Sequence, residues 1–234
     1  MRTWAIGDFM QSWRQAGGYY RDPNSYWEAR HDEHRDSLQG PGCIRLDEEA
    51  NRDDYQAKWD RLRLVLEREV QDGARRILDA GCGTGWFTRR VAKLGFVEVD
   101  AVDFSTTAAE IAQRNAPTSR VRVGELTEIT SAQPYDVVMC IDVLFHVVDD
   151  ATWARSVNNL AALASRRGAL VIQDSYNETG SQQPADHVRF RSLPTYQREL
   201  REWRLEAYNT YVLPNEVIRK DLMVFRRAAP TKFA

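Results

Sequence analysis

Three closely spaced glycines, with an acidic residue on either side, form the part of the sequence best suited to chemistry. Gly81, Gly83 and Gly85 follow an apolar stretch that ends at Asp79, and a second acid, Asp103, ends the next apolar stretch. Glycine accepts positive φ and lets a ligand approach the backbone without a Cβ in the way. The helix expected after the glycines offers unpaired N–H groups to a polar ligand. The segment is therefore a candidate ligand-binding loop.

The two acids indicate which kind of ligand the loop takes. A dinucleotide fingerprint that starts at Gly81 needs a glycine at position 86, where this sequence has Trp86. An acid before the glycines suits an ammonium group and repels a pyrophosphate. Asp103 is placed to accept hydrogen bonds from ribose hydroxyls. Together these residues describe a nucleoside that carries a cationic amino-acid tail.

The same residues resemble the motifs of a known family. The stretch Asp79–Gly85 resembles the first motif, D/E-x-G-x-G-x-G, of class I S-adenosylmethionine-dependent methyltransferases. Asp103–Ser105 resembles the second motif, whose acid binds the ribose and whose next residue flanks adenine. Residues 124–126 lie where the family often has an Asp that contacts the adenine amino group, and Glu125 replaces it here. Residues 135–142 resemble the fourth strand, whose end lies beside the methionine part of the cofactor.

The resemblance implies S-adenosylmethionine as cofactor and S-adenosylhomocysteine as product. It also implies that an aromatic N-terminal segment closes over the cofactor, with cation–π attraction to the sulfonium and an ion pair between Arg30 and the methionine carboxylate. Ordinary helix packing is the alternative for that segment. The candidate cofactor-binding residues are Asp79, Gly81, Cys82, Gly83, Gly85, Asp103, Phe104, Ser105, Glu125, Leu126, Cys140, Tyr19, Tyr26 and Arg30.

Candidate catalytic residues follow the expected strand over residues 135–141. His146 is the candidate general base, because imidazole titrates near neutral pH, and Asp142 is the second candidate. A base is needed only where the acceptor carries a proton that must leave, since positioning alone accelerates methyl transfer. Packing against the N-terminal segment, or a hydrogen bond to the loop, is the alternative for His146. The candidate acceptor-binding residues are Tyr20, Trp27, Tyr176, His187, Arg189, Arg191 and Tyr196, for whose arginines a charged surface is the alternative.

Apolar runs alternate with helical patterns between residues 75 and 175. This alternation predicts βαβ crossovers and a parallel sheet covered on both faces. The expected strands are 76–79, 96–103, 120–123, 135–141 and 169–173, and the expected helices are 86–94, 105–115 and 151–164. A loop over 177–186, a helix over 192–203 and an antiparallel hairpin of strands 205–212 and 217–225 follow. With the resemblance, the fold class is α/β: a Rossmann-like, doubly wound, seven-stranded sheet, mostly parallel, with a C-terminal antiparallel hairpin.

The first 70 residues show helical patterns and no strand pattern. Amphipathic spacing predicts helices over 4–13, 25–30 with Ser25 as its cap, and 47–70. We therefore expect an N-terminal helical lid or cap over 1–70 and a methyltransferase domain over 71–234. The aromatic N-terminus fits burial in a homodimer partner as well as closure over its own site.

Composition narrows the function further. With 43% hydrophobic residues and a net charge of −2, the chain folds around a core and has no overall attraction to nucleic acid or membranes. Its three cysteines are far apart without metal-ligand spacing, so neither a disulfide framework nor a metal site is expected. His31 and His34, three residues apart, have no supporting carboxylate. No targeting or membrane-spanning segment is evident, and a cytoplasmic location is expected.

These observations favour methyl transfer to a small-molecule acceptor at oxygen or nitrogen. A nucleic-acid (tRNA) methyltransferase is the second hypothesis. Nucleic-acid methyltransferases that modify exocyclic amines usually carry an N/D-P-P-Y/F motif after the fourth strand. The corresponding residues here, Asp142-Val-Leu-Phe145, do not resemble that motif. A non-catalytic S-adenosylmethionine-binding regulatory protein is the third hypothesis. An enzyme that uses the charge of the bound cofactor without transferring methyl is the fourth.

Overall fold

The computed structural model describes residues 22–175, 177–178, 180–215 and 219–228. The helix expected over 4–13 and the candidate residues Tyr19, Tyr20 and Tyr176 lie outside the described residues. Among the described residues, no helix combines the length and the apolar character needed to cross a bilayer.

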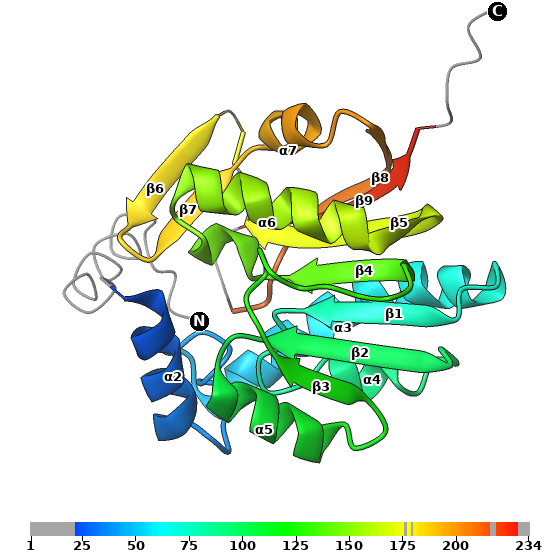
Figure 1. Cartoon of the computed structure of the whole chain (residues 1–234). Coiled ribbons are helices and arrows are strands. Elements are labelled where there is room, and N and C mark those ends of the chain that lie inside the picture. The colour runs from blue at the N-terminus through cyan, green and yellow to red at the C-terminus, as the bar shows by residue number, and fades with distance from the viewer. Residues whose placement is uncertain (1–21, 176, 179, 216–218, 229–234) are drawn as a thin grey trace, which may run out of the picture.

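Seven strands form one sheet in the order β3-β2-β1-β4-β5-β9-β8 (Figure 1). Strands β1 to β5 run parallel, and β9 is antiparallel to both of its neighbours, β5 and β8. The predicted α/β fold with a C-terminal antiparallel hairpin is confirmed. Because the strand order reverses between β1 and β4, a crevice opens at the carboxyl ends of these two strands. The strand bounds are β1 Arg76–Ala80, β2 Glu98–Asp103, β3 Arg120–Val123, β4 Tyr135–Ile141, β5 Ala164–Ser175, β8 Trp203–Val212 and β9 Arg219–Arg227.

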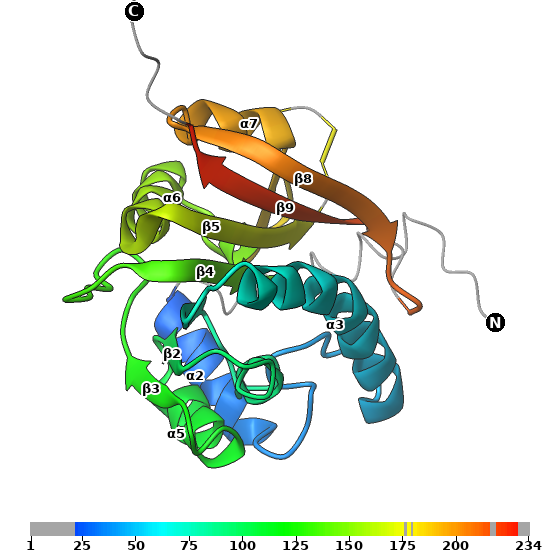
Figure 2. The same ribbon diagram turned by 90° about the vertical axis from the view of Figure 1, so that its right-hand side faces the viewer.

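Helices cover both faces of this sheet (Figure 2). On one face lie α3 (Glu48–Gln71), α4 (Thr88–Val91) and α5 (Thr106–Asn115), and on the other α6 (Asp150–Leu163) and α7 (Leu193–Glu199). Leu62 and Leu66 of α3 are fully buried in the same cluster as Ile77 of β1. Thus α3 is part of the main core, whereas α2 (Pro23–Glu33) packs against α5. The domain boundary at residue 70 stays a prediction.

Several elements differ from their predicted bounds. Helix α2 begins at Pro23, where Asp22 rather than Ser25 caps it by accepting a hydrogen bond from the Asn24 amide at 3.1 Å. The helix expected over 86–94 is the short α4. The helix expected over 192–203 ends at Glu199. The predicted loop over 177–186 contains β6 (Ser181–Ala185), which pairs with β7 (Val188–Arg191) to form a separate two-stranded sheet. β6 itself shows no apolar alternation, whereas Val188 and Phe190 of β7 alternate with arginines and are buried against Phe145.

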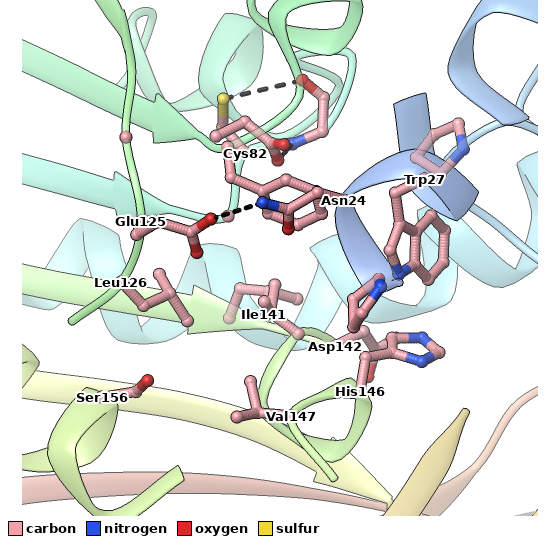
Figure 3. A pocket seen from close by; sticks show the side chains of 18 of the residues that line it. Asn24, Trp27, Cys82, Glu125, Leu126, Ile141, Asp142, His146, Val147 and Ser156 are labelled. Atoms are coloured by element: carbon pink, nitrogen blue, oxygen red, sulfur yellow. Dashed lines mark hydrogen bonds between the residues drawn. The ribbon is translucent and has the colours of Figure 1, made fainter. Parts of the chain in front are cut away.

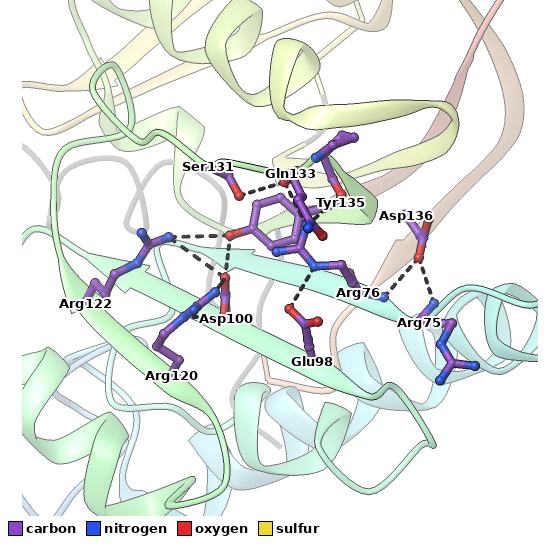
Figure 4. A network of polar contacts seen from close by, with 11 residues as sticks. Arg75, Arg76, Glu98, Asp100, Arg120, Arg122, Ser131, Gln133, Tyr135 and Asp136 are labelled. Atoms are coloured by element: carbon purple, nitrogen blue, oxygen red, sulfur yellow. Dashed lines mark hydrogen bonds and ion pairs between the residues drawn. The ribbon is translucent and has the colours of Figure 1, made fainter.

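A polar network joins the amino-terminal half of the sheet, away from the crevice (Figure 4). The buried Asp100 carboxylate accepts hydrogen bonds from Arg120 Nε at 2.9 Å, from Arg120 Nη2 at 2.5 Å and from the Tyr135 hydroxyl at 2.5 Å. Burial alone would raise the pKa of Asp100, but the hydrogen bonds from Arg120 and Tyr135 outweigh it and lower that pKa. The network therefore links β2, β3 and β4 through side-chain hydrogen bonds to Asp100.

Replacement of Asp100 tests the contribution of this network to stability. We expect Asp100→Asn to lower the free energy of unfolding by about 2 kcal/mol, because it removes a charged acceptor from the buried Tyr135 hydroxyl and from the exposed Arg120 guanidinium. Chemical denaturation followed by circular dichroism measures the difference. Glu98→Gln, at an exposed carboxylate paired with Arg76, is the control and should change stability by less than about 0.5 kcal/mol. Equal stability of Asp100→Asn and wild type would contradict the structural role.

Candidate functional site

A cavity of about 340 Å³ opens at the carboxyl ends of β1, β2 and β4 (Figure 3). Its wall combines the glycine loop, the ends of β2 and β3, helix α2 and the turn after β4. Among the described residues that line it there is no arginine and no lysine. The residues that line the cavity include Asn24, Trp27, His31, Tyr55, Gly81, Cys82, Gly83, Thr84, Trp86, Asp103, Phe104, Glu125, Leu126, Ile141, Asp142, Val143, His146, Val147 and Val148.

Two positions of the glycine loop require glycine because a side chain there would clash with neighbouring residues of the protein. Gly81 has a φ of +77°, and a Cβ there would lie 2.5 Å from Cγ2 of Val143. Gly85 has a φ of +80°, and a Cβ there would lie 2.8 Å from Cα of Ala112 on α5. A side chain at either position would force both backbone strain and a steric clash. The loop that joins β1 to α4 can therefore turn tightly and pack against α5, while Gly81 and Gly83 line the cavity.

Asp79 does not line the cavity, in contrast to the expectation that it faces the ammonium group of a ligand. It is buried beneath the glycine loop, where it accepts a hydrogen bond from Thr88 Oγ1 at 2.6 Å. Burial raises the pKa of Asp79 to about 7 despite that hydrogen bond. In this position Asp79 fixes the start of α4 to the end of β1.

Asp103 does line the cavity, as predicted from the second motif. Its Oδ2 accepts a hydrogen bond from the Gly83 amide at 2.8 Å, and its Oδ1 accepts one from the Ser105 amide at 3.0 Å. Burial raises the pKa of Asp103 to about 6, because it outweighs these two hydrogen bonds. Phe104 lies beside it in the wall. The acid that ends β2 is thus held rigidly against the glycine loop and presents its edge to the cavity.

Helix α2 is fastened over this part of the cavity by side chains that sequence analysis did not single out. Asn24 Nδ2 donates a hydrogen bond to Glu125 Oε1 at 3.0 Å (Figure 3). Glu28 accepts hydrogen bonds from Ser105 Oγ at 2.6 Å and from the amide and hydroxyl of Thr107 at 3.1 and 2.6 Å. Both residues belong to a polar helix whose sequence resembles a solvated surface, so only their distant partners reveal the contact. Ser105 itself caps α5 and does not line the cavity.

Trp27 and His31 are the ring side chains of α2 that line the cavity, next to Pro23 and Asn24. Trp27 packs edge-on against His146, with ring centroids 4.7 Å apart. Burial lowers the pKa of His31 to about 4, and its Nδ1 lies 3.1 Å from Ser105 Oγ. Arg30 points elsewhere: its Nε and Nη2 donate to the carbonyl of Gln39 at 3.1 and 2.8 Å. Arg30 therefore stabilises the connection to α3, and neither it nor Tyr26 lines the cavity.

His146 lies in the 3₁₀ turn η1 (Leu144–His146) directly after β4. Its Nδ1 is 2.9 Å from the carbonyl oxygen of His187. Since a carbonyl only accepts, Nδ1 carries the proton and Nε2 carries the lone pair of the neutral ring. Burial lowers the pKa of His146 to about 3. The ring is therefore uncharged at neutral pH and has a defined tautomer.

Asp142 directly follows β4 and has a φ of 58°, a conformation that residues other than glycine rarely adopt. It forms ion pairs with Lys58 Nζ at 2.6 Å and with Lys220 Nζ at 3.3 Å. Burial would raise the pKa of Asp142, but the ammonium groups of Lys220 and Lys58 outweigh it and hold that pKa well below its usual range. Asp142 thus remains a carboxylate and joins α3, β4 and β9. Neither lysine stands out in the sequence, because both lie within ordinary helix and strand patterns.

The remaining candidate residues support the site without reaching the cavity. Arg189 and Arg191 form ion pairs with Asp150 at 2.9 and 3.0 Å, which fix β7 to the start of α6. The buried Tyr196 hydroxyl donates to the buried Asp174 carboxylate. His187 contributes its backbone carbonyl, and Cys140 and Gly85 are buried away from the lining. From the sequence alone, a structural role for these arginines and this tyrosine could not be told apart from a role in acceptor binding.

Comparison with known proteins agrees with this geometry. The family model of a methyltransferase domain matches residues 77–168. A malonyl-[acyl-carrier protein] O-methyltransferase of Halalkalibacterium halodurans is 36% identical over 113 residues, which cover 45% of this chain and 41% of that protein. A ubiquinone biosynthesis O-methyltransferase of Methylocella silvestris is 35% identical over 109 residues, covering 44% and 41% respectively. The chain thus matches about two-fifths of the length of these curated relatives.

Solved structures extend the likeness to nearly the whole fold. Magnesium protoporphyrin IX methyltransferase from Synechocystis PCC 6803 with bound S-adenosylhomocysteine has a TM-score of 0.68 and 17% identity, covering 88% of this chain and 98% of that one. The N-methyltransferase NodS of Bradyrhizobium japonicum, also in complex with S-adenosylhomocysteine, has a TM-score of 0.60 and 17% identity, covering 73% and 87%. Residues 77–168 thus match a methyltransferase domain, and the fold of the chain is similar to that of S-adenosylmethionine-dependent methyltransferases.

Proposed function

We propose that this protein transfers the methyl group of S-adenosylmethionine to an oxygen atom of a small, largely apolar acceptor. The observation that carries the proposal is the composition of one cavity. It joins an acid-lined half beside the glycine loop to an apolar half that ends at a neutral histidine. The curated relatives named above, both O-methyltransferases, support the choice of oxygen.

The donor set of the cavity fits S-adenosylmethionine. Asp103 and Glu125 are two carboxylate acceptors that would hold the ribose hydroxyls and the adenine amino group, and Phe104 and Leu126 would enclose the base. The lack of arginine and lysine among the described lining residues disfavours a phosphate-bearing cofactor. When bound, S-adenosylmethionine supplies an electrophilic methyl group on a positively charged sulfur. Trp27 and Tyr55 add aromatic side chains to the lining of the cavity.

His146 would act on the acceptor rather than on the cofactor. Its Nε2 carries the lone pair, because the carbonyl of His187 fixes the proton on Nδ1. An acceptor hydroxyl that donates a hydrogen bond to Nε2 is oriented for attack, and it becomes strongly acidic as its oxygen gains the methyl group. A weakly basic imidazole is sufficient to take that proton. An amine acceptor would gain less from such a base, so the buried histidine favours oxygen.

The nearby apolar residues would exclude water and hold the acceptor. Val143, Val147 and Val148 line the cavity around His146, and Trp27 closes it from α2. We propose that α2 acts as a lid, anchored through Glu28 on α5 and through Asn24 on Glu125. Asp142 is a positioning residue in this scheme, since its ion pairs fix the turn that carries His146. The three scattered cysteines lead us to propose the reducing cytoplasm as the location.

Calorimetric titration with S-adenosylhomocysteine tests the cofactor site. We expect Asp103→Asn to weaken binding about 30-fold or more, since a charged acceptor is worth about 2 kcal/mol. Asp136→Asn is the matched control, because Asp136 also accepts hydrogen bonds from two backbone amides, those of Arg75 and Arg76, but far from the cavity.

The pH dependence of S-adenosylhomocysteine binding tests the same carboxylate. Wild-type affinity should fall as the pH drops below about 6, where Asp103 takes up a proton and loses acceptor capacity. No binding by folded wild type would refute the proposal.

Turnover of His146→Gln tests the proton acceptor. We expect the rate with a hydroxyl acceptor to fall about 100-fold while S-adenosylhomocysteine affinity stays within about twofold. Because burial lowers the pKa of His146 to about 3, titration of His146 should not change the wild-type rate near pH 6.5. The pH profiles of wild type and variant should therefore have the same shape in that range. His34→Gln, at the end of α2, is the control. Unchanged turnover in His146→Gln would show that positioning alone carries the reaction.

Unfolding of Asp142→Asn separates positioning from catalysis. We expect a loss of about 3 kcal/mol in the free energy of unfolding, because the buried ammonium of Lys220 loses its carboxylate. Chemical denaturation measures it, with Asp53→Asn on the exposed side of α3 as the control. A variant as stable as wild type but without turnover would contradict the positioning role and make Asp142 a direct participant.

A further inference from the structure

A second depression, of about 400 Å³, lies on the other side of the glycine loop from the proposed cofactor cavity. The α2–α3 connection, the first turns of α3, helix α4 and the end of α5 meet there (Figure 2). Five arginines line it: Arg35, Arg52, Arg89, Arg90 and Arg114. We call it the arginine groove.

The charge of the arginine groove is opposite to that of the chain. Asp36 and Glu48 are the carboxylates among its described lining residues, so five guanidinium groups face two acids, whereas the whole chain carries a net charge of −2. Asp32, which pairs with Arg35, and Glu110 on α5 are two further acids near the groove. A concave surface lined by one sign of charge concentrates the field and attracts counter-ions. The groove is therefore a local anion-attracting surface on an otherwise acidic protein.

The arginines of the groove differ in how they are neutralised. Arg35 pairs with Asp32 at 2.5 Å and Arg52 pairs with Glu48 at 3.2 Å, both on the protein surface. Within the described residues, no carboxylate forms an ion pair with Arg89, Arg90 or Arg114. Arg89 and Arg90 repel one another, and Arg114 lines the same depression, so an anion placed among these guanidinium groups is attracted to all three.

Arg90 is also held in place before any ligand arrives. Its guanidinium stacks 3.3 Å from the ring centroid of Trp86, and its Nη1 donates to the Trp86 carbonyl at 3.2 Å. Burial and the neighbouring Arg89 lower the pKa of Arg90 to about 10, as expected for a crowded cation that lacks a counter-ion. Pre-positioned guanidinium groups match the oxygens of phosphate groups, which each accept two parallel hydrogen bonds.

We infer that the arginine groove binds a small phosphate-bearing polyanion of the size of pyrophosphate, through Arg89, Arg90 and Arg114. The site is separate from the cofactor cavity, which has no arginine or lysine among its described lining residues. Thr84 and Trp86 line both depressions, and Asn115 donates a hydrogen bond to the Thr84 carbonyl at 2.9 Å. The bound anion would therefore rest against the back of the glycine loop.

Titration calorimetry with pyrophosphate, at constant ionic strength set with sodium chloride, tests this inference. We expect saturable one-to-one binding by wild type and at least a tenfold loss of affinity in Arg89→Gln and in Arg114→Gln. Both residues are exposed, so neither variant should alter folding. Arg198→Gln is the matched control, since Arg198 is an exposed arginine on α7, on the opposite face of the sheet, and should bind as wild type does.

Further titrations identify the group that is recognised and its source. Binding of pyrophosphate and of ADP, without binding of adenosine, would support recognition of phosphate groups, and tighter binding of ADP would indicate a nucleotide source. Absence of saturable pyrophosphate binding, or equal affinity in the Arg89→Gln and Arg114→Gln variants, would overturn the inference. Binding of an oligoglutamate peptide but not of pyrophosphate would also overturn it, in favour of an acidic protein partner. None of these titrations depends on the proposed methyl transfer.

Discussion

The site depends on the hydrogen bonds through which Asp103, at the end of β2, holds the loop that follows β1. Its carboxylate accepts the amides of Gly83 and Ser105, so one side chain fixes both the glycine loop and the first turn of α5. Helix α2 then docks on that turn through Glu28, and Asn24 reaches Glu125 beyond β3. The glycine loop and Asp103 meet because the parallel strands β1 and β2 end at the same edge of the sheet, whereas α2 is attached there by side-chain hydrogen bonds.

Buried charge organises the opposite wall of the cavity. The carboxylate of Asp142 lies between the ammonium groups of Lys58 and Lys220, which come from α3 and β9. Such a cluster stabilises the fold only if its geometry is well defined, because each desolvated charge costs several kcal/mol without its partners. The cluster therefore fixes the path of the chain after β4, including the positive φ of Asp142 and the turn that carries His146. A neutral histidine and a permanently ionised aspartate, four residues apart, thus take different roles because their surroundings differ.

The relation between pattern and structure differs across the chain. Strand β4 has the bounds that its apolar run predicts, because burial on both faces demands continuous apolar residues. The edge strand β3 also has its predicted bounds, although its valines alternate with arginines and the strand is exposed or half-buried. The β6–β7 hairpin was missed, since Ser181–Ala185 has neither alternation nor β-branched residues and is held by backbone pairing. Arg30, Arg191 and Tyr196 have side chains suited to binding a ligand, yet each is satisfied by the protein itself. Residue type shows what a side chain is able to bind, whereas its neighbours decide whether it does.

The sequence by itself determined the doubly wound sheet, the glycine loop, the acid at the end of β2 and the histidine after β4. These follow from local periodicity and from spacing along single elements, which one chain carries without reference to distant contacts. Tertiary structure alone decided that Asp79 supports the loop from below, that Asn24 and Glu28 fasten α2, and that Lys58 and Lys220 share Asp142. It also gathered Arg89, Arg90 and Arg114 around one depression. The physical reason is that the burial and pairing of polar groups depend on segments that folding brings together. No local sequence pattern encodes which distant segments become neighbours.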